Sequence, residues 1–388
     1  MNYHRILEHK LAEHFKYNKQ AIILLGARQI GKTTLLRRVF PDALYLLADE
    51  DPIAQTLETY SSKKYQSYIR GHKQVIIDEI HLISNPGRAV KILYDQFPGI
   101  QLIITGSSSL HIKNKTAESM AGRAFDYFLY PLTFWEMLFQ LEVETEHKPH
   151  YIIDKIQTGD LTPTPHLFNT LDFLTPTLTY GLYPEIINRH QKEEYLLNLT
   201  SKAIFKDIVE LNLIENREKA MELLQVLAYQ IGNIISYSEI SRKLGLSIPT
   251  VQRYIDIFEQ SFLLYRLYPF SKNKRDEIGR APKIYFWDVG LRNALITDFQ
   301  KPQLRNDLGA LFENFIISEI KKEISYKGLY YRVNYWRTKS GSEVDLVLSD
   351  PNELIGVEIK YSRGSVTQAF TNRYPEAKTM VINSENFY

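Results

Sequence analysis

The chain has 388 residues, which at about 150 residues per domain predicts two or three domains and excludes a single small module. Its 47 Lys and Arg residues against 45 Asp and Glu residues leave a net charge of +2, and a content of 44% hydrophobic and 24% charged residues excludes a disordered or fibrous chain. The sequence has no Cys, which excludes disulfides, a thiolate nucleophile and a zinc site built on sulfur. We expect a soluble, cytoplasmic protein, because the N-terminal residues lack a signal-peptide pattern and the apolar runs are too short to span a membrane.

The first part of the chain alternates short apolar runs with polar helical stretches. This alternation predicts a first domain over residues 1–132 that contains a parallel sheet with helices between its strands. The predicted strands are 21–26, 43–48, 74–79, 101–106 and 125–132. Residues 133–230 are expected to form a helical lid or linker. Within it, the Thr- and Pro-rich segment 158–181 is predicted to be mostly loop.

Residues 231–285 outline a winged helix-turn-helix. A short helix over 238–244 is expected to stop at Gly245, and Ser247 is expected to cap a second helix over 250–261. A strand at 263–268 follows, which completes the outline.

Residues 286–388 predict a small α/β domain with a restriction-endonuclease-like order of elements. A long helix precedes three strands, a short helix and a last strand, at residues 307–324, 330–338, 342–349, 354–362, 366–372 and 378–383. The overall fold class is therefore α/β.

A glycine-rich segment follows the first predicted strand and opens the next predicted helix. It reads GARQIGKT and fits the pattern G-x-x-x-x-G-K-[ST]. Its two glycines allow the backbone N–H groups to point at phosphate oxygens, and the helix N-terminus adds a favourable dipole. Lys32 is expected to neutralise the β- and γ-phosphates, and the Thr33 hydroxyl to ligate Mg²⁺. The predicted nucleotide-binding residues are Gly26, Ala27, Arg28, Gln29, Ile30, Gly31, Lys32, Thr33 and Thr34.

Two acids end the strand predicted at residues 74–79. Asp78 is expected next to the Mg²⁺ ion, and Glu79 is expected to polarise the water that attacks the γ-phosphorus. Because GTPases position this water differently, the pair favours ATP hydrolysis. The alternative is that both acids only begin a solvated loop. Their place one strand–helix unit after the glycine-rich segment favours the metal site.

Three further polar residues are candidates for the same site. Thr105 and Ser107 end the next strand and are expected to hydrogen-bond the γ-phosphate or the attacking water, although turn chemistry also favours these residue types. Arg123 precedes the last strand and is placed to reach a phosphate in its own subunit or in a neighbour, with a plain surface arginine as the alternative. If Arg123 acts in a neighbour, hydrolysis needs a dimer or a ring, so we expect a homo-oligomer.

A second constellation of charged residues lies near the C-terminus. Asp345 and Glu358 fall on two adjacent predicted strands, and Lys360 shares a strand face with Glu358. Neighbouring carboxylates repel each other, so a Mg²⁺ ion between them is predicted, with Lys360 positioning a water or stabilising an oxyanion. Glu313, on an apolar helix face, is a further candidate ligand, and Glu319 competes with it. The arrangement is that of metal-dependent phosphodiester hydrolysis. The alternative is a set of ordinary strand-end charges.

These motifs, taken together and in order, resemble a widespread family of prokaryotic AAA-type ATPases. The resemblance rests on the segments GARQIGKTTLLRRVF, VIIDEIH, ITGSSS, AGR before FLYPLTFWEM, YGLYPEII, IFKDIV, FWDVGLRN, LGALFENFIISEI, SEVDLVL and GVEIK. For the family it implies ATP hydrolysis in the N-terminal domain, and a C-terminal region similar to a winged helix followed by a PD-(D/E)xK nuclease-like domain. The implied nuclease-like residues are Glu313, Asp345, Glu358 and Lys360.

Local charge favours DNA as a partner despite the near-neutral total. Residues 230–285 hold nine Lys and Arg residues against five Asp and Glu residues, a balance of +4. The expected function is therefore ATP-driven processing of DNA. One alternative is a nucleotide-switched interaction protein with an inactive nuclease-like domain. Another is a nuclease that does not need ATP.

Overall fold

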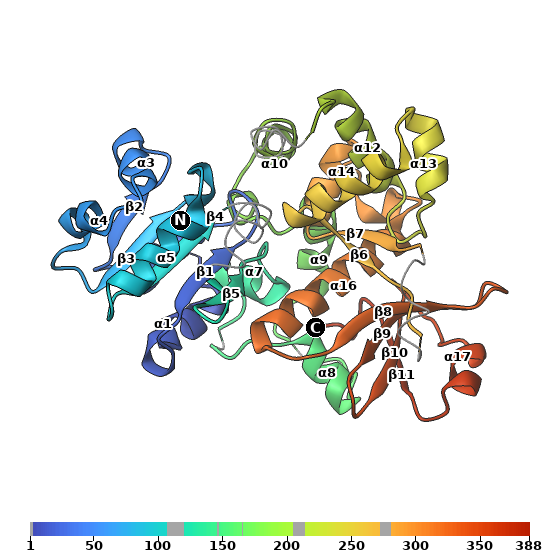
Figure 1. The fold of residues 1–388 in the computed structure, drawn as a ribbon. Helices are drawn as coiled ribbons and strands as arrows, with labels where there is room; N and C mark the ends of the chain where they lie inside the picture. The colour runs from blue at the N-terminus through green and yellow to red at the C-terminus, as the bar shows by residue number, and fades with distance from the viewer. Residues whose placement is uncertain (1–2, 107–119, 146, 165, 205–213, 272–280) are drawn as a thin grey trace. The chain divides into compact units, whose positions relative to one another are not determined.

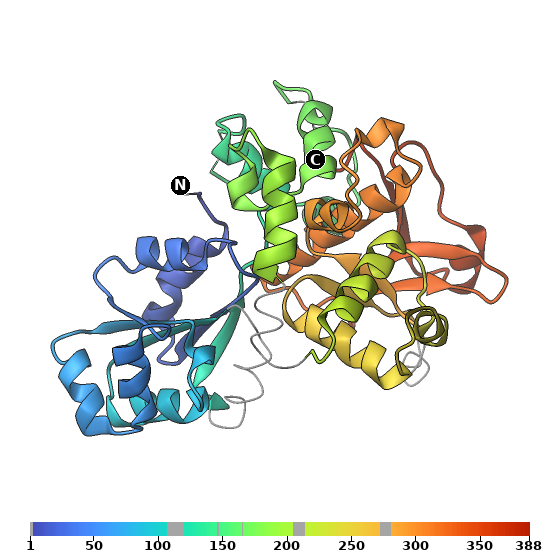
Figure 2. The ribbon, with the colours of Figure 1, turned by 90° about the horizontal axis from the view of Figure 1, so that it is seen from above.

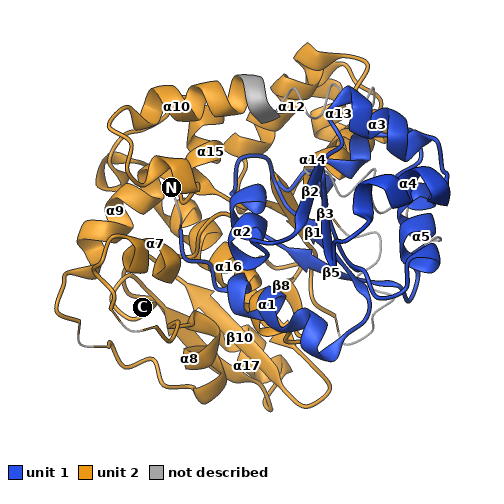
Figure 3. Ribbon diagram, turned by 90° about the vertical axis from the view of Figure 1, so that its left-hand side faces the viewer, with its two compact units in different colours: residues 1–130, 260–262 blue, residues 131–259, 263–388 orange. Residues whose placement is uncertain are grey.

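The computed structural model describes residues 3–106, 120–145, 147–164, 166–204, 214–271 and 281–388. It divides the chain into two compact units, residues 1–130 with 260–262 and residues 131–259 with 263–388 (Figure 3). No helix among the described residues is long and apolar enough to cross a membrane.

A five-stranded parallel sheet in the order β2-β3-β4-β1-β5 forms the centre of the first unit (Figure 1). Its three inner strands are almost completely buried, as their continuous apolar sequences predict. The strands are β1 (Ala21–Leu25), β2 (Leu44–Leu47), β3 (Gln74–Asp78), β4 (Gln101–Gly106) and β5 (Ala124–Phe128). The predicted parallel α/β architecture is confirmed.

Helices alternate with these strands along the chain. They are α1 (Leu7–Tyr17), α2 (Lys32–Val39), α3 (Asp51–Glu58), α4 (Ser62–Ile69), the 3₁₀ turn η1 (Ile80–Leu82) and α5 (Pro86–Gln96). Because all five strands run in the same direction, β1, β3 and β4 end at the same edge of the sheet. That edge is where open α/β sheets bind ligands.

The second unit begins with helices and ends with a four-stranded mixed sheet in the order β11-β10-β9-β8, drawn in orange to red in Figures 1 and 2. Strand β10 pairs antiparallel with β9 and parallel with β11. The sheet elements are β8 (Arg332–Arg337), β9 (Glu343–Ser349), β10 (Leu354–Ile359), α17 (Gln368–Arg373) and β11 (Lys378–Ile382). The predicted order of elements is confirmed.

The helical part of this unit contains two short strands and a long helix. Strands β6 (Leu264–Leu267) and β7 (Lys283–Phe286) pair antiparallel, and α16 (Leu308–Lys327) precedes the mixed sheet. The other elements are α7 (Phe134–Gln140), α8 (Ile152–Thr158), α9 (Thr170–Tyr180), η2 (Pro184–Ile186), α10 (Lys192–Asn198), the π-helix η3 (Leu199–Ile204), α12 (Arg217–Tyr229), α13 (Tyr237–Leu244), α14 (Ile248–Gln260), α15 (Val289–Leu295) and η5 (Pro302–Leu304).

Helix α9 corrects the loop expected for the second half of residues 158–181, whereas the described residues between 159 and 169 contain no helix or strand, as predicted. Asn169 caps it by accepting a hydrogen bond from the Leu171 N–H (3.2 Å), and Pro176 lies inside it. Leu174 and Leu178 are completely buried. Their four-residue spacing is helical, and burial of this apolar face outweighs the Thr and Pro content that favours a loop.

Two helices, α13 and α14, form on either side of Gly245, where the sequence predicts them. Gly245 ends α13 in the left-handed conformation (φ 65°), and the Ser247 hydroxyl accepts from the Thr250 N–H (3.2 Å) at the start of α14. Strands β6 and β7 follow. Residues 272–280, which include four of the nine Lys and Arg residues counted in 230–285, lie outside the described residues.

Two of the segments quoted for the family resemblance, YGLYPEII (180–187) and FWDVGLRN (286–293), contact each other in the second unit. Asp288 accepts hydrogen bonds from the N–H groups of Leu182 (2.6 Å) and Leu291 (3.0 Å). A Cβ added to Gly181 would lie 2.1 Å from the Asp288 carboxylate, and one added to Gly290 would lie 2.0 Å from a backbone oxygen. Close packing therefore explains both glycines.

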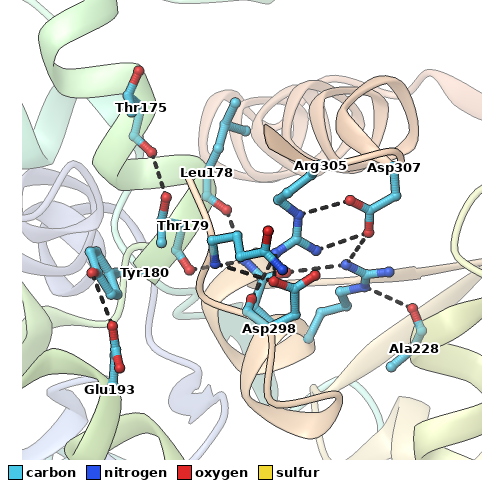
Figure 4. A network of polar contacts seen from close by, with 12 residues as sticks. Thr175, Leu178, Thr179, Tyr180, Glu193, Ala228, Asp298, Arg305 and Asp307 are labelled. Atoms are coloured by element: carbon cyan, nitrogen blue, oxygen red, sulfur yellow. Dashed lines mark hydrogen bonds and ion pairs between the residues drawn. The ribbon is translucent and has the colours of Figure 1, made fainter. Parts of the chain in front are cut away.

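The same region contains a polar network that fixes α15 (Figure 4). Asn293 donates to the carbonyls of Leu178 and Thr179 (both 2.9 Å). The buried Arg292 donates to Ala228 O (2.7 Å) and to Asp307, which also accepts from Arg305. These bonds are internal and satisfy the buried guanidinium, so the network is structural.

Candidate nucleotide-binding site

The glycine-rich loop connects β1 to α2 at the carboxyl edge of the parallel sheet. A Cβ on Gly26 would lie 2.2 Å from the backbone oxygen of Leu129, so this position accepts only glycine. Gly31 precedes α2 in the left-handed conformation (φ 91°). The backbone between them lies at the start of the helix, where N–H groups are free of intrahelical partners and the dipole favours an anion.

The other predicted loop residues differ in exposure. Ala27 and Ile30 are buried and anchor the loop, whereas Arg28 is half-buried and Gln29 and Thr34 are exposed. Gln29 has a positive φ of 60°. The buried Ala27 and Ile30 pack into the protein interior, and Gln29 and Thr34 are exposed to solvent.

Lys32 is buried and folds back over the loop. Its Nζ donates to the carbonyl oxygens of Gly26 (3.0 Å) and Ala27 (2.9 Å). These bonds hold the ammonium group at the loop, and a phosphate oxygen would be a stronger acceptor than either carbonyl because it carries charge. The position of Lys32 fits the predicted role.

Asp78 is the polar centre of the site. It is buried at the end of β3, where its Oδ2 accepts from the Thr33 hydroxyl (2.6 Å) and from the Tyr45 hydroxyl, and its Oδ1 accepts from the Glu79 N–H (3.0 Å). A buried carboxylate beside a hydroxyl is the oxygen-rich ligand set that Mg²⁺ prefers. Thr33 and Asp78 would hold the metal, which supplies charge neutralisation at the phosphates.

Tyr45 was missed by the sequence argument. It lies on β2, whose register places Leu47 opposite Asp78 and therefore Tyr45 on the same sheet face as Asp78. Burial, followed by the bond to Asp78, raises the pKa of Tyr45, so its hydroxyl stays protonated and remains a donor. The Arg37 guanidinium covers the ring at 4.2 Å. The parallel register of β2 and β3 was the information needed, and sequence patterns do not give it.

Glu79 follows Asp78 in a left-handed conformation (φ 53°) that is unusual for a residue with a side chain. Its Oε2 lies 3.2 Å from His81 Nδ1, and its side chain is 28% exposed. The carboxylate is therefore accessible, as a residue that activates a water must be.

Thr105 ends β4 next to β1 and is completely buried. Its hydroxyl has no hydrogen-bond partner among the described residues. An unpaired buried hydroxyl is costly, so this position fits the predicted contact to a phosphate or water. Ser107 lies outside the described residues.

Arg123 lies at the opposite edge of the sheet from the glycine-rich loop. It precedes Ala124, which pairs with Ala21 at the start of β1, whereas the loop follows Leu25. Four strand residues span about 13 Å. The guanidinium also pairs with Asp95 (3.0 Å). Arg123 therefore lies far from its own phosphate site, which leaves a role in a neighbouring subunit or a plain surface arginine paired with Asp95.

The second predicted constellation is brought together in part. The Lys360 ammonium lies 3.0 Å from Asp345 Oδ2 and 2.8 Å from Glu358 Oε1, and Asp345 Oδ2 also accepts from the Ile359 N–H (2.8 Å). Glu358 Oε2 is buried without a partner among the described residues. Two buried carboxylates with an unsatisfied oxygen fit one divalent cation, which would supply Lewis acidity there. Burial, then the Asp345 charge, raises the pKa of Glu358.

Glu313 does not complete a metal site with this pair. Its Oε1 accepts from the Tyr285 hydroxyl and lies 3.3 Å from Lys283 Nζ. Burial raises its pKa to about 7, against the opposing effect of Lys283. Over the described part of the chain, no group of three or more His, Cys, Asp or Glu side chains is arranged to hold a metal ion. The role of Glu313 as a further ligand beside Asp345 and Glu358 stays a prediction, because a lysine from β7 pairs with Glu313 here.

Glu319, the competing candidate, has a structural role. It accepts from the Phe134 N–H (2.7 Å) and pairs with Lys322 (2.6 Å), which also donates to Leu132 O. One turn further along α16, Glu323 accepts from the N–H groups that begin α8. Both acids are buried and act as caps for other segments.

Comparison with family models divides the chain into three matches. Residues 18–138 match a family described as an AAA domain. Residues 173–303 and 308–387 match two domains of unknown function, DUF8612 and DUF4143. The first match contains the glycine-rich loop and the acid pair, so the N-terminal region is similar to AAA-type P-loop ATPase domains.

Similar proteins are known along nearly the whole chain. An uncharacterised protein of Methanocaldococcus jannaschii is 26% identical over 98% of this chain and 84% of its own length. An uncharacterised protein of Mycobacterium tuberculosis is 24% identical over 87% of this chain and 70% of its own length. A solved structure, a Walker-type ATPase of Pyrococcus abyssi, is 14% identical over 76% of this chain and 96% of that chain, with a TM-score of 0.44. A likeness of this size does not establish a shared function.

Proposed function

We propose that this protein is a Mg²⁺-dependent ATPase whose turnover drives the handling of DNA by the C-terminal unit. The hydrolytic half of the proposal rests on one observation. The Thr33 hydroxyl and the buried Asp78 carboxylate lie 2.6 Å apart at the N-terminus of α2, with Lys32 beside them and Glu79 next in the chain. A metal-ligand pair, a phosphate-binding cation and an accessible base are the groups that ATP hydrolysis requires.

Steady-state ATP hydrolysis tests this half. Lys32→Ala should lower kcat/KM by at least about 100-fold, because a charge-assisted phosphate contact contributes about 1.5–3 kcal/mol to binding alone and more in the transition state. Asp78→Asn should abolish the Mg²⁺ dependence. Lys73→Ala, at an exposed lysine on the same unit, is the control and should leave the rate unchanged. Equal rates in the Lys32 and Lys73 variants would refute an ATPase role for this loop.

The DNA-handling half rests on the exposed face around the start of α14. Ser247, Gln252 and Arg253 are exposed there, and Arg242 and Lys243 are exposed at the end of α13. In helix-turn-helix proteins the N-terminal residues of the second helix contact base edges and the flanking cations contact phosphates. The local charge balance of +4 favours the same partner.

The DNA-binding role of Arg253 can be tested against Arg189, an arginine in a similar environment. It pairs with Glu215 (3.0 Å) and lies over the ring of Tyr254, and Arg189 makes an equivalent pair with Glu185 (3.0 Å) over another tyrosine. Their side chains are 46% and 47% exposed.

Binding to duplex, forked and single-stranded DNA should weaken about tenfold in Arg253→Ala and should not change in Arg189→Ala. The salt dependence of log K should also become shallower by about one unit. If none of the three DNA forms binds or stimulates ATP hydrolysis, the DNA half fails while the ATPase half stands.

One observation favours a second candidate, a nucleotide-switched interaction protein. Each lysine near the C-terminal acids is already paired inside the unit, Lys360 with Asp345 and Glu358 and Lys283 with Glu313. This candidate predicts slow turnover and partner binding that differs between ATP and ADP.

A Mg²⁺-dependent DNA cleavage assay separates the candidates. Cutting that is lost in Asp345→Ala but kept in Glu79→Gln would instead indicate a nuclease that does not need ATP.

The position of Arg123 supports a homo-oligomer. Because it lies at the far edge of its own sheet, a catalytic role requires the phosphate site of a neighbour. We expect the ATPase rate per subunit to rise with protein concentration. Mixing Arg123→Ala with Glu79→Gln should then restore part of the activity, because mixed interfaces pair one intact arginine with one intact base. A rate that is independent of concentration, with no restoration, would exclude the trans role.

A further inference from the structure

Lys283 is a buried lysine among the C-terminal acids, and it comes from β7 rather than from the mixed sheet. It is 1% exposed. Its Nζ lies 3.3 Å from Glu313 Oε1, contacts Glu343 Oε1, and lies 5.4 Å from the centroid of the Tyr335 ring. A buried ammonium group is stable only when it is paired, and here two carboxylates pair with it.

The acids form two halves, each with a lysine between two carboxylates. In one half Lys283 lies between Glu313 and Glu343. In the other, Lys360 lies between Asp345 and Glu358. The halves adjoin, because Glu343 and Asp345 are two residues apart on β9 and share a sheet face.

The two halves differ in whether a carboxylate oxygen is left without a hydrogen-bond partner. Lys360 is 43% exposed and leaves Glu358 Oε2 buried without a partner among the described residues. Lys283 is buried between its acids, and the Tyr285 hydroxyl donates to Glu313 as well. In the Asp345–Glu358 half one carboxylate oxygen therefore remains for an incoming cation, whereas in the Glu313–Glu343 half Lys283 already contacts both carboxylates.

We propose that Lys283 is an internal cation that takes the place of a metal ion between Glu313 and Glu343 and confines divalent metal binding to the Asp345–Glu358 half. The Lys283 ammonium group and a divalent ion need the same carboxylate oxygens, at N···O distances near 3 Å and metal–oxygen distances near 2 Å. The buried Lys283 therefore excludes a metal ion between its two acids, whereas the exposed Lys360 leaves Glu358 Oε2 available to one. Two-metal phosphoryl chemistry needs ions about 3.5–4 Å apart. Lys283 prevents a second ion from joining the first.

Mn²⁺ binding to the full chain tests this proposal without any activity. The measurement uses the Asp78→Asn background in every sample, so that the ATP site does not contribute, and counts bound Mn²⁺ by calorimetry and electron paramagnetic resonance. With Lys283 present we expect one bound Mn²⁺ per chain. Glu358→Gln should weaken the affinity for this ion at least tenfold. Lys283→Met should bind one further Mn²⁺, and adding Glu313→Gln should remove that ion. Lys283→Arg, which keeps the charge, should bind one.

Two results would overturn the proposal. One is an equal number of bound Mn²⁺ ions in the folded Lys283→Met variant and in the parent. The other comes from a variant that keeps Lys283. Glu313→Gln in the parent should leave the Mn²⁺ affinity within threefold. A loss of affinity of tenfold or more would overturn the proposal, because it would show that Glu313 is already a metal ligand. This second measurement decides the question even if Lys283→Met fails to fold. The outcome is independent of ATP hydrolysis, because the ATP site is silenced throughout.

Discussion

Glu79→Gln separates the predicted general base from the rest of the ATP site. The backbone fixes the position of this residue, because its N–H donates to Asp78 Oδ1 (3.0 Å) and its φ is 53°. Neither feature depends on the side-chain charge. Glutamine has the same shape as glutamate but cannot accept the proton of an attacking water. The substitution therefore removes the chemistry and keeps the geometry.

The expected loss follows from the role. A positioned general base contributes about 10²–10⁴-fold to the rate, which corresponds to about 2.7–5.5 kcal/mol of transition-state stabilisation. In the folded state the Glu79 carboxylate lies 3.2 Å from His81 Nδ1, and the Glu79 side chain is partly exposed. A contact of this kind contributes less than about 1 kcal/mol. Catalysis should fall strongly while stability and ATP binding change little.

Single-turnover hydrolysis and binding of a fluorescent ATP analogue measure the two effects separately. We expect kcat to fall by about 10²–10⁴-fold and the ATP Kd to change by less than about threefold. Glu50→Gln is the control, since Glu50 is exposed before α3 and its side chain makes no capping bond. A hydrolysis rate in Glu79→Gln within tenfold of the parent would refute the assignment of Glu79 as the base.

Three further substitutions test the surrounding structure. Gly26→Ala should abolish ATP binding and lower the melting temperature, measured by scanning fluorimetry, since its Cβ would lie 2.2 Å from a carbonyl oxygen. Asp288→Ala should destabilise the second unit by about 2–5 kcal/mol, because two buried N–H groups lose their acceptor; faster hydrogen exchange at those amides checks this. Burial acts to raise the pKa of Asp307, but hydrogen bonds and charges from two arginines lower it to about 2. The depressed pKa stabilises the fold above about pH 4, and this contribution is lost as the pH falls toward 2. Asp307→Asn should therefore cost about 2 kcal/mol at pH 7 and almost nothing at pH 2 in urea unfolding; an equal cost at both pH values would contradict the assignment.

The sequence predicted those parts of the fold and site that depend on local pattern. The strands of both sheets, the caps at Gly245 and Ser247, and the adjacency of Asp345 and Glu358 all follow from short-range periodicity and turn chemistry. Helix α9 was missed because its Thr and Pro content hid two buried leucines.

The parts that sequence reasoning missed depend on contacts between distant segments. Tyr45 reaches Asp78 through the parallel register of two strands, and Lys283 contacts Glu313, which is 30 residues further along the chain. The sequence left open whether Arg123 acts in its own subunit, acts in a neighbour or is a plain surface arginine, because it does not show that β5 runs parallel to β1.

Helix α16 bears on how this protein can be divided for laboratory study. Its Glu319 and Glu323 hold backbone amides of Phe134, Ile152 and Ile153, which precede it by more than 150 residues. A fragment that starts near residue 286 would keep these buried acids and lose the segments that satisfy them. Such a fragment should aggregate or be degraded, whereas one that starts near residue 131 should be recovered in folded form. The family matches that begin at 173 and 308 therefore mark stretches of similar sequence and not pieces that can be expressed on their own.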